Sequence, residues 1–183
     1  MSPQNPMDVQ EFYDIISTQT LPSEALFGLM WSPMKKLMLL ADAQWTEWSM
    51  FDKTEFAPEN SDDDAIHTIN FNWKDTWSFK FGIEYFIKEI LSIRGGYARH
   101  QSPSPDETLS PTFPALPQNV ISLGVGYNGP VRTIVDQSLM GKLTFDAFIQ
   151  YVMSEKATST LPDYPLTYSS NYFVFGFGVG FNF

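Results

Sequence analysis

Residues 171–183 read NYFVFGFGVGFNF, and this stretch decides the fold. Apolar side chains occupy every second position, and the intervening positions are mostly glycine. The first set is Phe173, Phe175, Phe177, Val179, Phe181 and Phe183, and the second is Tyr172, Val174, Gly176, Gly178, Gly180 and Asn182. A repeat of two is the side-chain period of a β-strand. A glycine face gives a protein core nothing to pack. The pattern therefore predicts a strand whose phenylalanines face lipid and whose small residues line a lumen.

Composition supports a membrane barrel and excludes several other classes. The chain has 183 residues, 43% of them hydrophobic and 16% aromatic, and this aromatic share is common in barrels with aromatic girdles. No apolar run reaches the ~18–20 residues that a spanning helix needs. The net charge of −10 argues against a nucleic-acid partner, because such binding requires a basic face. With 0 cysteines the chain has neither disulfides nor thiol chemistry.

Six further stretches alternate in the same way, so the sequence predicts an all-β protein with about seven antiparallel strands. The predicted strands are residues 25–31, 39–45, 70–86, 90–99, 119–127, 142–152 and 171–183. Tight turns are expected at 33–36 and 87–89, and long loops at 52–64, 101–118 and 154–170, with a connection of undefined form at 128–141. Short turns at one edge and long loops at the other are typical of an outer-membrane barrel.

The amino-terminal segment, residues 1–22, is polar and punctuated by prolines, and it precedes a barrel segment spanning 23–183. Val9, Phe12, Tyr13 and Ile16 have helical spacing and predict a short amphipathic helix. The first residues have neither a basic region nor an apolar region, so we expect no signal peptide in this stretch.

Alternation by itself does not tell which face points inward. A soluble lipid-binding barrel would bury the apolar face, whereas a membrane barrel turns it toward lipid. Aromatic residues at both ends of the apolar band favour the membrane, because they match the two bilayer interfaces. They are Trp31, Tyr85 and Tyr127 near one rim and Trp45, Trp77, Tyr97 and Tyr151 near the other.

Several motifs, in order along residues 19–183, resemble the FadL/TodX family of outer-membrane transporters of hydrophobic compounds. They are a Leu-Pro step before a strand hairpin, the sequence WTEWS at 45–49, NWKDTW at 72–77, RGGY at 94–97, SPSPDE at 102–107, SLGVGY at 122–127 and the final aromatic strand. The resemblance implies an up-and-down barrel of roughly fourteen strands, an even number. This chain would supply the carboxyl-terminal half.

The resemblance also implies passive transport of long-chain fatty acids or other hydrophobic compounds across the bacterial outer membrane. The family's amino-terminal plug and lateral wall gap have no counterpart in these residues. The implied partners are outer-membrane lipid, a fatty-acid or aromatic-hydrocarbon ligand, and the barrel-assembly machinery. The terminal Val179, Phe181 and Phe183 resemble the signal that this machinery reads.

Three charged residues are candidates for a site in the lumen. Lys80, Glu84 and Arg94 lie on the polar faces of two neighbouring predicted strands. Lys80 or Arg94 could bind a fatty-acid carboxylate, but an ion-pair ladder that offsets buried charge is the favoured interpretation. For an external mouth, the two longest loops offer apolar candidates, namely Leu109, Phe113, Leu116, Tyr164 and Leu166.

We expect no catalytic residue, metal or cofactor. The run Asp62-Asp63-Asp64 lacks the alternating ligand spacing of a calcium loop. His67 and His100 have no metal-ligand spacing, and an envelope lipid-modifying enzyme built on His100 and Ser102 remains a minor alternative.

Overall fold

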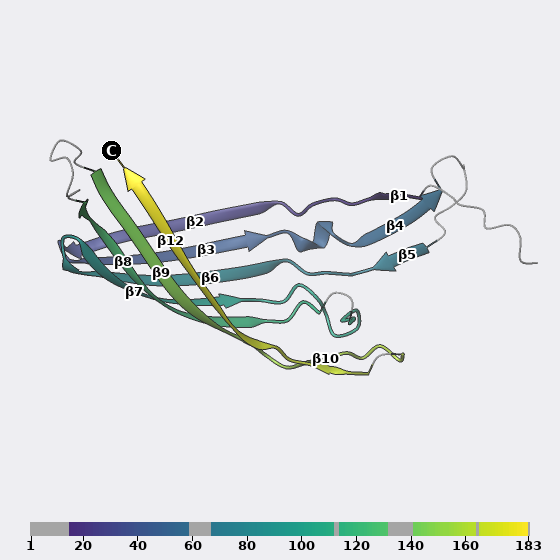
Figure 1. Ribbon diagram of the computed structural model, residues 1–183. Coiled ribbons are helices and arrows are strands. Elements are labelled where there is room, and N and C mark those ends of the chain that lie inside the picture. The colour runs from purple at the N-terminus through teal and green to yellow at the C-terminus, as the bar shows by residue number, and fades with distance from the viewer. Residues whose placement is uncertain (1–14, 59–66, 112–113, 132–140, 164, 183) are drawn as a thin grey trace, which may run out of the picture.

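The computed structural model describes residues 15–58, 67–111, 114–131, 141–163 and 165–182. Seven long strands form one antiparallel sheet in the order β12-β9-β8-β7-β6-β3-β2. Their bounds are β2 Glu24–Met34, β3 Leu37–Thr46, β6 Thr76–Lys88, β7 Leu91–His100, β8 Gln118–Val131, β9 Gly141–Ser154 and β12 Asn171–Asn182. Figure 1 shows them as a strongly curved and twisted wall, with the short turns at one end and the long loops at the other. The predicted all-β architecture with seven strands is confirmed.

The pairing register keeps all seven apolar faces on one side. Phe177 of β12 is opposite Ala147 of β9, and Ala147 is opposite Val125 of β8. Continuing across the sheet, Val125 is opposite Ile93, and Ile93 is opposite Tyr85. Because side chains alternate along each strand, one face is apolar except at its loop end, where Arg99 and Asn119 lie, and we call it the outward face. The opposite, inner face carries most of the charged side chains of the strands and most of the glycines.

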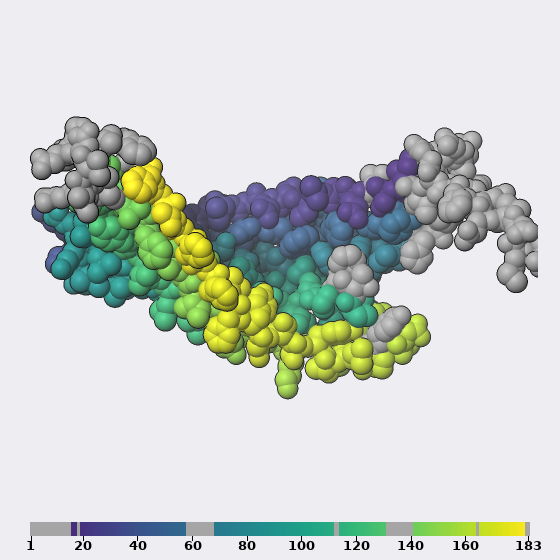
Figure 2. Space-filling view, in the orientation of Figure 1, coloured from purple at the N-terminus to yellow at the C-terminus, as the bar shows by residue number. Residues whose placement is uncertain are grey.

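The outward face is not covered by any other described element. Phe175 is 81% exposed and Phe177 80% exposed. Figure 2 shows β12 uncovered along its length at the front of the molecule. The buried residues of the described chain lie mainly among the loops and at strand ends, so the sheet has no hydrophobic core of its own. Such a sheet requires an apolar surrounding medium, as a barrel wall does in a bilayer.

Two small sheets extend beyond the loop end of the wall. One has the order β1-β4-β5, with β1 at Ile15–Thr18, β4 at Lys53–Pro58 and β5 at His67–Asn70. The other pairs β10, Ala157–Thr158, with β11, Thr167–Tyr168. Figure 1 shows the first sheet continuing past the ends of β2, β3 and β6. A 3₁₀ turn, η1, covers Trp48–Met50.

Several predicted boundaries were wrong. The loop expected at 52–64 contains β4, in which Thr54 is buried at 2% exposure while Lys53 and Glu55 are exposed on the other side. The loop expected at 154–170 likewise contains β10 and β11.

The strand expected to begin at residue 70 begins at Thr76. Asn72, with φ 49°, has left-handed backbone geometry that interrupts the extended chain. The strand expected at 119–127 extends further, to Val131.

The predicted amphipathic helix lies mostly outside the described residues. Its last residue, Ile16, belongs to strand β1, which pairs with β4, so the helical assignment is wrong there. In the described part of the chain no helix is long and apolar enough to cross a membrane.

Candidate functional site

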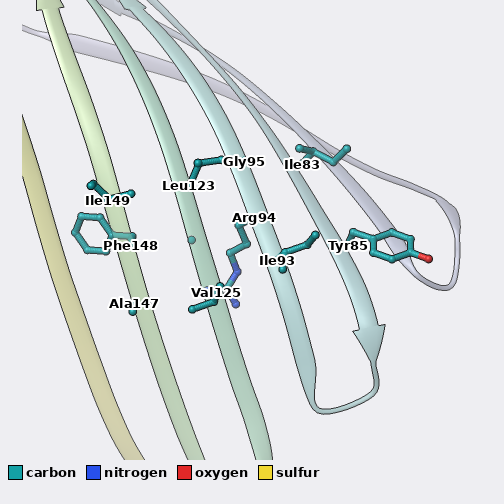
Figure 3. Close-up of a pocket in the computed structure, with 11 residues that line it drawn as sticks. Ile83, Tyr85, Ile93, Arg94, Gly95, Leu123, Val125, Ala147, Phe148 and Ile149 are labelled. Carbon is teal, nitrogen blue, oxygen red and sulfur yellow. The ribbon is translucent and has the colours of Figure 1, made fainter.

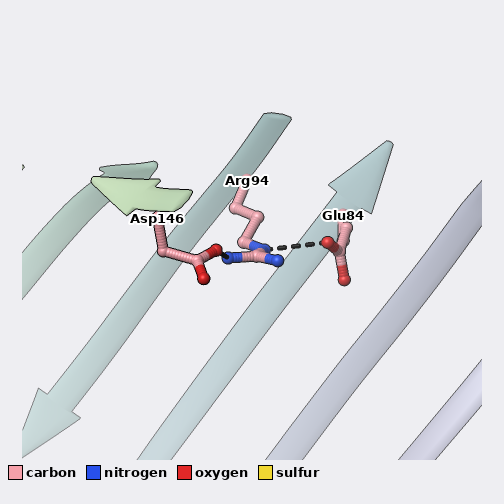
Figure 4. A network of polar contacts seen from close by, with 3 residues as sticks. All are labelled: Glu84, Arg94 and Asp146. Carbon is pink, nitrogen blue, oxygen red and sulfur yellow. Dashed lines mark hydrogen bonds and ion pairs between the residues drawn. The ribbon is translucent and has the colours of Figure 1, made fainter. Parts of the chain in front are cut away.

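Three charged side chains meet on the inner face of the sheet. Arg94 of β7 donates from Nε to Glu84 Oε1 of β6 at 2.8 Å and from Nη1 to Asp146 Oδ1 of β9 at 2.6 Å. Figure 4 shows the guanidinium between the two carboxylates. The cluster carries one positive and two negative charges, so the cation is already satisfied by protein ligands. The predicted proximity of Glu84 and Arg94 is observed, while Asp146 was not among the sequence candidates.

A glycine makes this contact between non-adjacent strands feasible. Arg94 and Asp146 lie on β7 and β9, and β8 runs between them with Gly126 beneath the guanidinium. A Cβ at Gly126 would lie 2.8 Å from Arg94 Nη2 and 2.9 Å from Asp146 Oδ1. The bare position therefore lets two side chains lie flat across the middle strand.

Other inner-face glycines serve the same purpose. A Cβ at Gly28 would lie 2.9 Å from Asp42 Oδ1, and one at Gly176 would lie 2.6 Å from the ring of Phe148. A Cβ at Gly178, in contrast, would meet no atom of the described residues within 4 Å. At most of these positions, the glycine predicted on this face leaves space that a larger side chain of a neighbouring strand occupies.

Lys80 occupies a different part of the inner face. It lies opposite Asp42 in the register and donates to Gln44 Oε1 at 3.3 Å. It lines a hollow of about 460 Å³ together with Arg94 and with the apolar side chains of Leu40 and Phe148. Charged and apolar groups thus share one open concavity, which suits an amphipathic ligand.

Two sequence motifs meet at the base of the outer loops. The backbone N–H of Ser49, in the WTEWS motif, donates to Asp75 Oδ1 of the NWKDTW motif at 3.0 Å. The rings of Trp48 and Trp73 stack edge to face with centroids 5.1 Å apart. Phe71 is buried at 6% exposure. This aromatic cluster joins the loop between β3 and β4 to the segment preceding β6, and sequence periodicity gave no sign of it.

The five mouth candidates are distributed unevenly. Leu109 is 1% exposed, so it packs inside the loop region, whereas Leu166 is 52% exposed. Leu116 is half-buried. Phe113 and Tyr164 lie outside the described residues. The mouth remains a prediction.

The terminal candidates Val179 and Phe181 lie on the outward face at 64% and 55% exposure. Phe183 is outside the described residues. Their orientation is that of lipid-facing residues, and the assembly signal remains a prediction.

The minor enzymatic alternative lacks the required geometry. His100 Nδ1 lies 3.0 Å from Ser78 Oγ, and Ser102 Oγ instead donates to the carbonyl oxygen of Ala115 at 2.5 Å. Among the residues that the structure describes, no group of three or more His, Cys, Asp or Glu side chains could hold a metal ion.

An antiparallel wall that is apolar outside and charged inside, with short turns at one end and long loops at the other, is a segment of an outer-membrane β-barrel. The profile of the family described as "Outer membrane protein transport protein (OMPP1/FadL/TodX)" matches residues 14–183, and the chain belongs to this family. The family resemblance and the outer-membrane location predicted from the sequence are therefore confirmed. Because this is a family of transport proteins, the prediction of a non-enzyme is confirmed as well.

Individual relatives are longer than this chain. A putative outer membrane protein of Neisseria meningitidis, NMB0088, is 35% identical over 79 residues, which are 40% of this chain and 17% of that protein. The crystal structure of a Pseudomonas aeruginosa FadL homologue matches 87% of this chain and 34% of its own, with a TM-score of 0.65 and 24% identity. The chain thus spans a minor part of these relatives.

Proposed function

We propose that this chain forms part of the wall of a closed barrel through which hydrophobic compounds cross the outer membrane passively. In the described sheet β12 and β2 each pair on one side only. Lipid does not tolerate unpaired strand edges, so further strands must complete the wall. The family and the minor share of the solved relative that the chain spans support this arrangement.

Long-chain fatty acids are the ligand class that the inner face fits best. The observation that carries this proposal is the 460 Å³ hollow in which Lys80 lies near Leu40 and Phe148. Arg94 is held by two carboxylates, whereas Lys80, although opposite Asp42 in the register, donates to the neutral amide of Gln44. We therefore assign the carboxylate of the ligand to Lys80 and its alkyl chain to the apolar side chains. Arg94 and Glu84 then serve to shape the wall.

Uptake of a charged ligand and of its uncharged analogue separates this assignment from a structural role. In the complete barrel, Lys80→Gln should slow uptake of oleic acid about tenfold, because a charge-assisted contact contributes roughly 1.5 kcal/mol. Uptake of methyl oleate should be unchanged, and Lys80→Arg should retain most of the fatty-acid rate. Lys74→Gln, a lysine of the outer loops, is the matched control. Equal losses for both ligands would refute the assignment.

We further propose that Leu116 and Leu166 contribute to the external mouth, and that Val179 and Phe181 contribute to recognition by the barrel-assembly machinery. Their exposure and position support these roles. Replacing Leu116 and Leu166 with serine should lower fatty-acid uptake. Replacing Val179 and Phe181 with serine should lower the yield of folded barrel. An unchanged uptake rate or an unchanged yield would refute the role proposed for that pair.

A further inference from the structure

The outward face has a recess in the middle of the wall. It is an open depression with a volume of about 610 Å³, and its lining comes from four adjacent strands, β6 to β9, as Figure 3 shows. Its walls are the side chains of Ile83, Tyr85, Leu123 and Ile149. Arg94 and Phe148 border it too, but their side chains contact partners on the inner face, so they contribute backbone to the floor.

One missing side chain and one short side chain create this recess. Along one register row, Ile83 is opposite Gly95, and Gly95 is opposite Leu123. Ala147 lies in the next row, opposite Val125. The surrounding branched side chains rise around these two small residues. The register of β7 with β8 and of β8 with β9 is continuous, so the recess has an unbroken floor and is not a passage through the wall.

Basic residues gather at the turn end of the wall. The described charged residues there are Lys35, Lys36, Lys88, Glu89 and Lys142. The lysines in this set are exposed. The backbone N–H of Phe86 donates to the carbonyl oxygen of Lys36 at 2.9 Å, which holds the β2–β3 turn against the end of β6. Lys36 and Lys88 therefore flank the same strand end.

The opposite end of the wall is acidic. Its described carboxylates include Glu47, Asp52, Asp75, Asp106, Glu107 and Glu155. The loop end also carries Lys53, Lys74, Arg99 and Lys156, but its carboxylates outnumber these cations. The described wall is therefore net positive at the turns and net negative at the loops. In outer-membrane barrels the turns face the periplasm, so the lysines lie at the inner leaflet, where headgroups are phospholipid.

We propose that the recess holds one acyl chain of an anionic phospholipid of the inner leaflet, with the lipid phosphate bound by Lys36 and Lys88. The dimensions agree. Tyr85 lies three residues from Lys88, about 10 Å along the strand. Gly95 lies four residues from the start of β7, about 13 Å, which is close to half the ~30 Å hydrocarbon thickness. Lysines beside an apolar groove provide the donors that recognise an anionic headgroup.

Native mass spectrometry of the complete barrel tests the site. The protein is released from nanodiscs containing equal amounts of phosphatidylglycerol and phosphatidylcholine, and the retained lipid is counted and identified. Ala147→Leu fills the recess, and Ala43→Leu is its control, since Ala43 is an outward alanine between Phe27 and Phe79. The double variant Lys36→Gln/Lys88→Gln removes the cations, and Lys53→Gln/Lys156→Gln removes two lysines of the loop end.

The wild-type protein should retain phosphatidylglycerol in preference to phosphatidylcholine. In the turn-end double variant, the ratio of retained phosphatidylglycerol to phosphatidylcholine should fall about fivefold for each lysine removed. In the loop-end control this ratio should not change. Ala147→Leu should lower the total retained lipid several-fold, while Ala43→Leu leaves it unchanged. Unchanged retention in Ala147→Leu, or an unchanged headgroup ratio in the turn-end variant, would each overturn the proposal.

Discussion

Substitution of Gly126 by alanine should weaken the wall, although the same change at Gly178 should strengthen it. Both glycines lie on the inner face, and each is opposite Asp146 in the register, one on β8 and the other on β12. A methyl group at Gly126 would lie 2.8 Å from Arg94 Nη2. A methyl group at Gly178 would meet nothing within 4 Å among the residues that the structure describes. The two substitutions therefore differ chiefly in whether the new methyl group meets the side chains of Arg94 and Asp146.

The magnitude follows from the exposure of the displaced ion pair. The side chains of Arg94 and Asp146 are 46% and 49% exposed, so loss of their contact costs about 1 kcal/mol after allowance for solvent screening. Among the described glycines none has a positive φ, so alanine fits the backbone at both sites and gains about 0.5 kcal/mol by restricting the unfolded chain. Gly178→Ala should then be stabilising by that amount. Gly126→Ala should be destabilising by about 0.5–1 kcal/mol.

Equilibrium urea unfolding of the complete barrel in lipid, followed by tryptophan fluorescence, measures both variants. The free energies of unfolding should differ by about 1–1.5 kcal/mol between them. Addition of Asp146→Asn to both backgrounds should reduce this difference, because the contact displaced by the methyl group is then already weakened. Equal free energies of the two alanine variants would refute the proposed role of glycine beneath the ion pair.

Three further outcomes are expected. Asp75→Ala should remove the acceptor of the Ser49 N–H, a contact that contributes about 1 kcal/mol. The outer loops of this variant should therefore be cleaved by protease several-fold faster than those of the wild-type protein. The hydrogen bond from Arg99 lowers the pKa of Glu155 below its ordinary value of 4.5. This contact therefore stabilises the rim fully above pH 4.5, and the stabilisation is lost as the pH falls through the folded-state pKa of Glu155. The rate of loop proteolysis should rise over that pH range in the wild-type protein and should not do so in Glu155→Gln. Phe177→Arg should lower the free energy of unfolding by about 2–4 kcal/mol in lipid if this residue lies near the bilayer centre.

The main sheet was predictable because its signal is periodic and repeated. The alternation of Phe173, Phe175 and Phe177 shows that the segment is a strand and which residues share one face. A register shift of one residue would move all of these side chains to the other face. The smaller β4 was missed because Lys53 and Glu55 dominate its short sequence, although they alternate with the buried Thr54. The high charge content of this segment predicted a loop, whereas in the structure its alternating side chains form a strand of a small sheet.

The inner-face site was only partly predictable, because its contacts depend on tertiary geometry. Glu84 and Arg94 follow from a hairpin register and could be expected to meet. Asp146 lies two strands away from Arg94, and its contact depends on the absence of a side chain at Gly126. No local pattern reveals that relation. The signal that could have found it is a glycine opposite a carboxylate on one neighbouring strand and diagonal to an arginine on the other, because Gly126 is opposite Asp146 and Ser92, and Arg94 lies two residues beyond Ser92.

Site-directed spin labelling tests most directly whether the apolar face meets hydrocarbon and the glycine face meets an aqueous lumen. The chain contains 0 cysteines, so Phe177→Cys and Gly178→Cys each introduce one labelling position into it, on opposite faces of β12. Any cysteine elsewhere in the complete barrel is replaced beforehand. In the complete barrel reconstituted in lipid, the label at 177 should collide often with oxygen and rarely with a water-soluble nickel chelate. The label at 178 should show the reverse. Equal accessibility at both positions, or a label at 177 that favours the nickel chelate, would contradict the outward orientation of the apolar face.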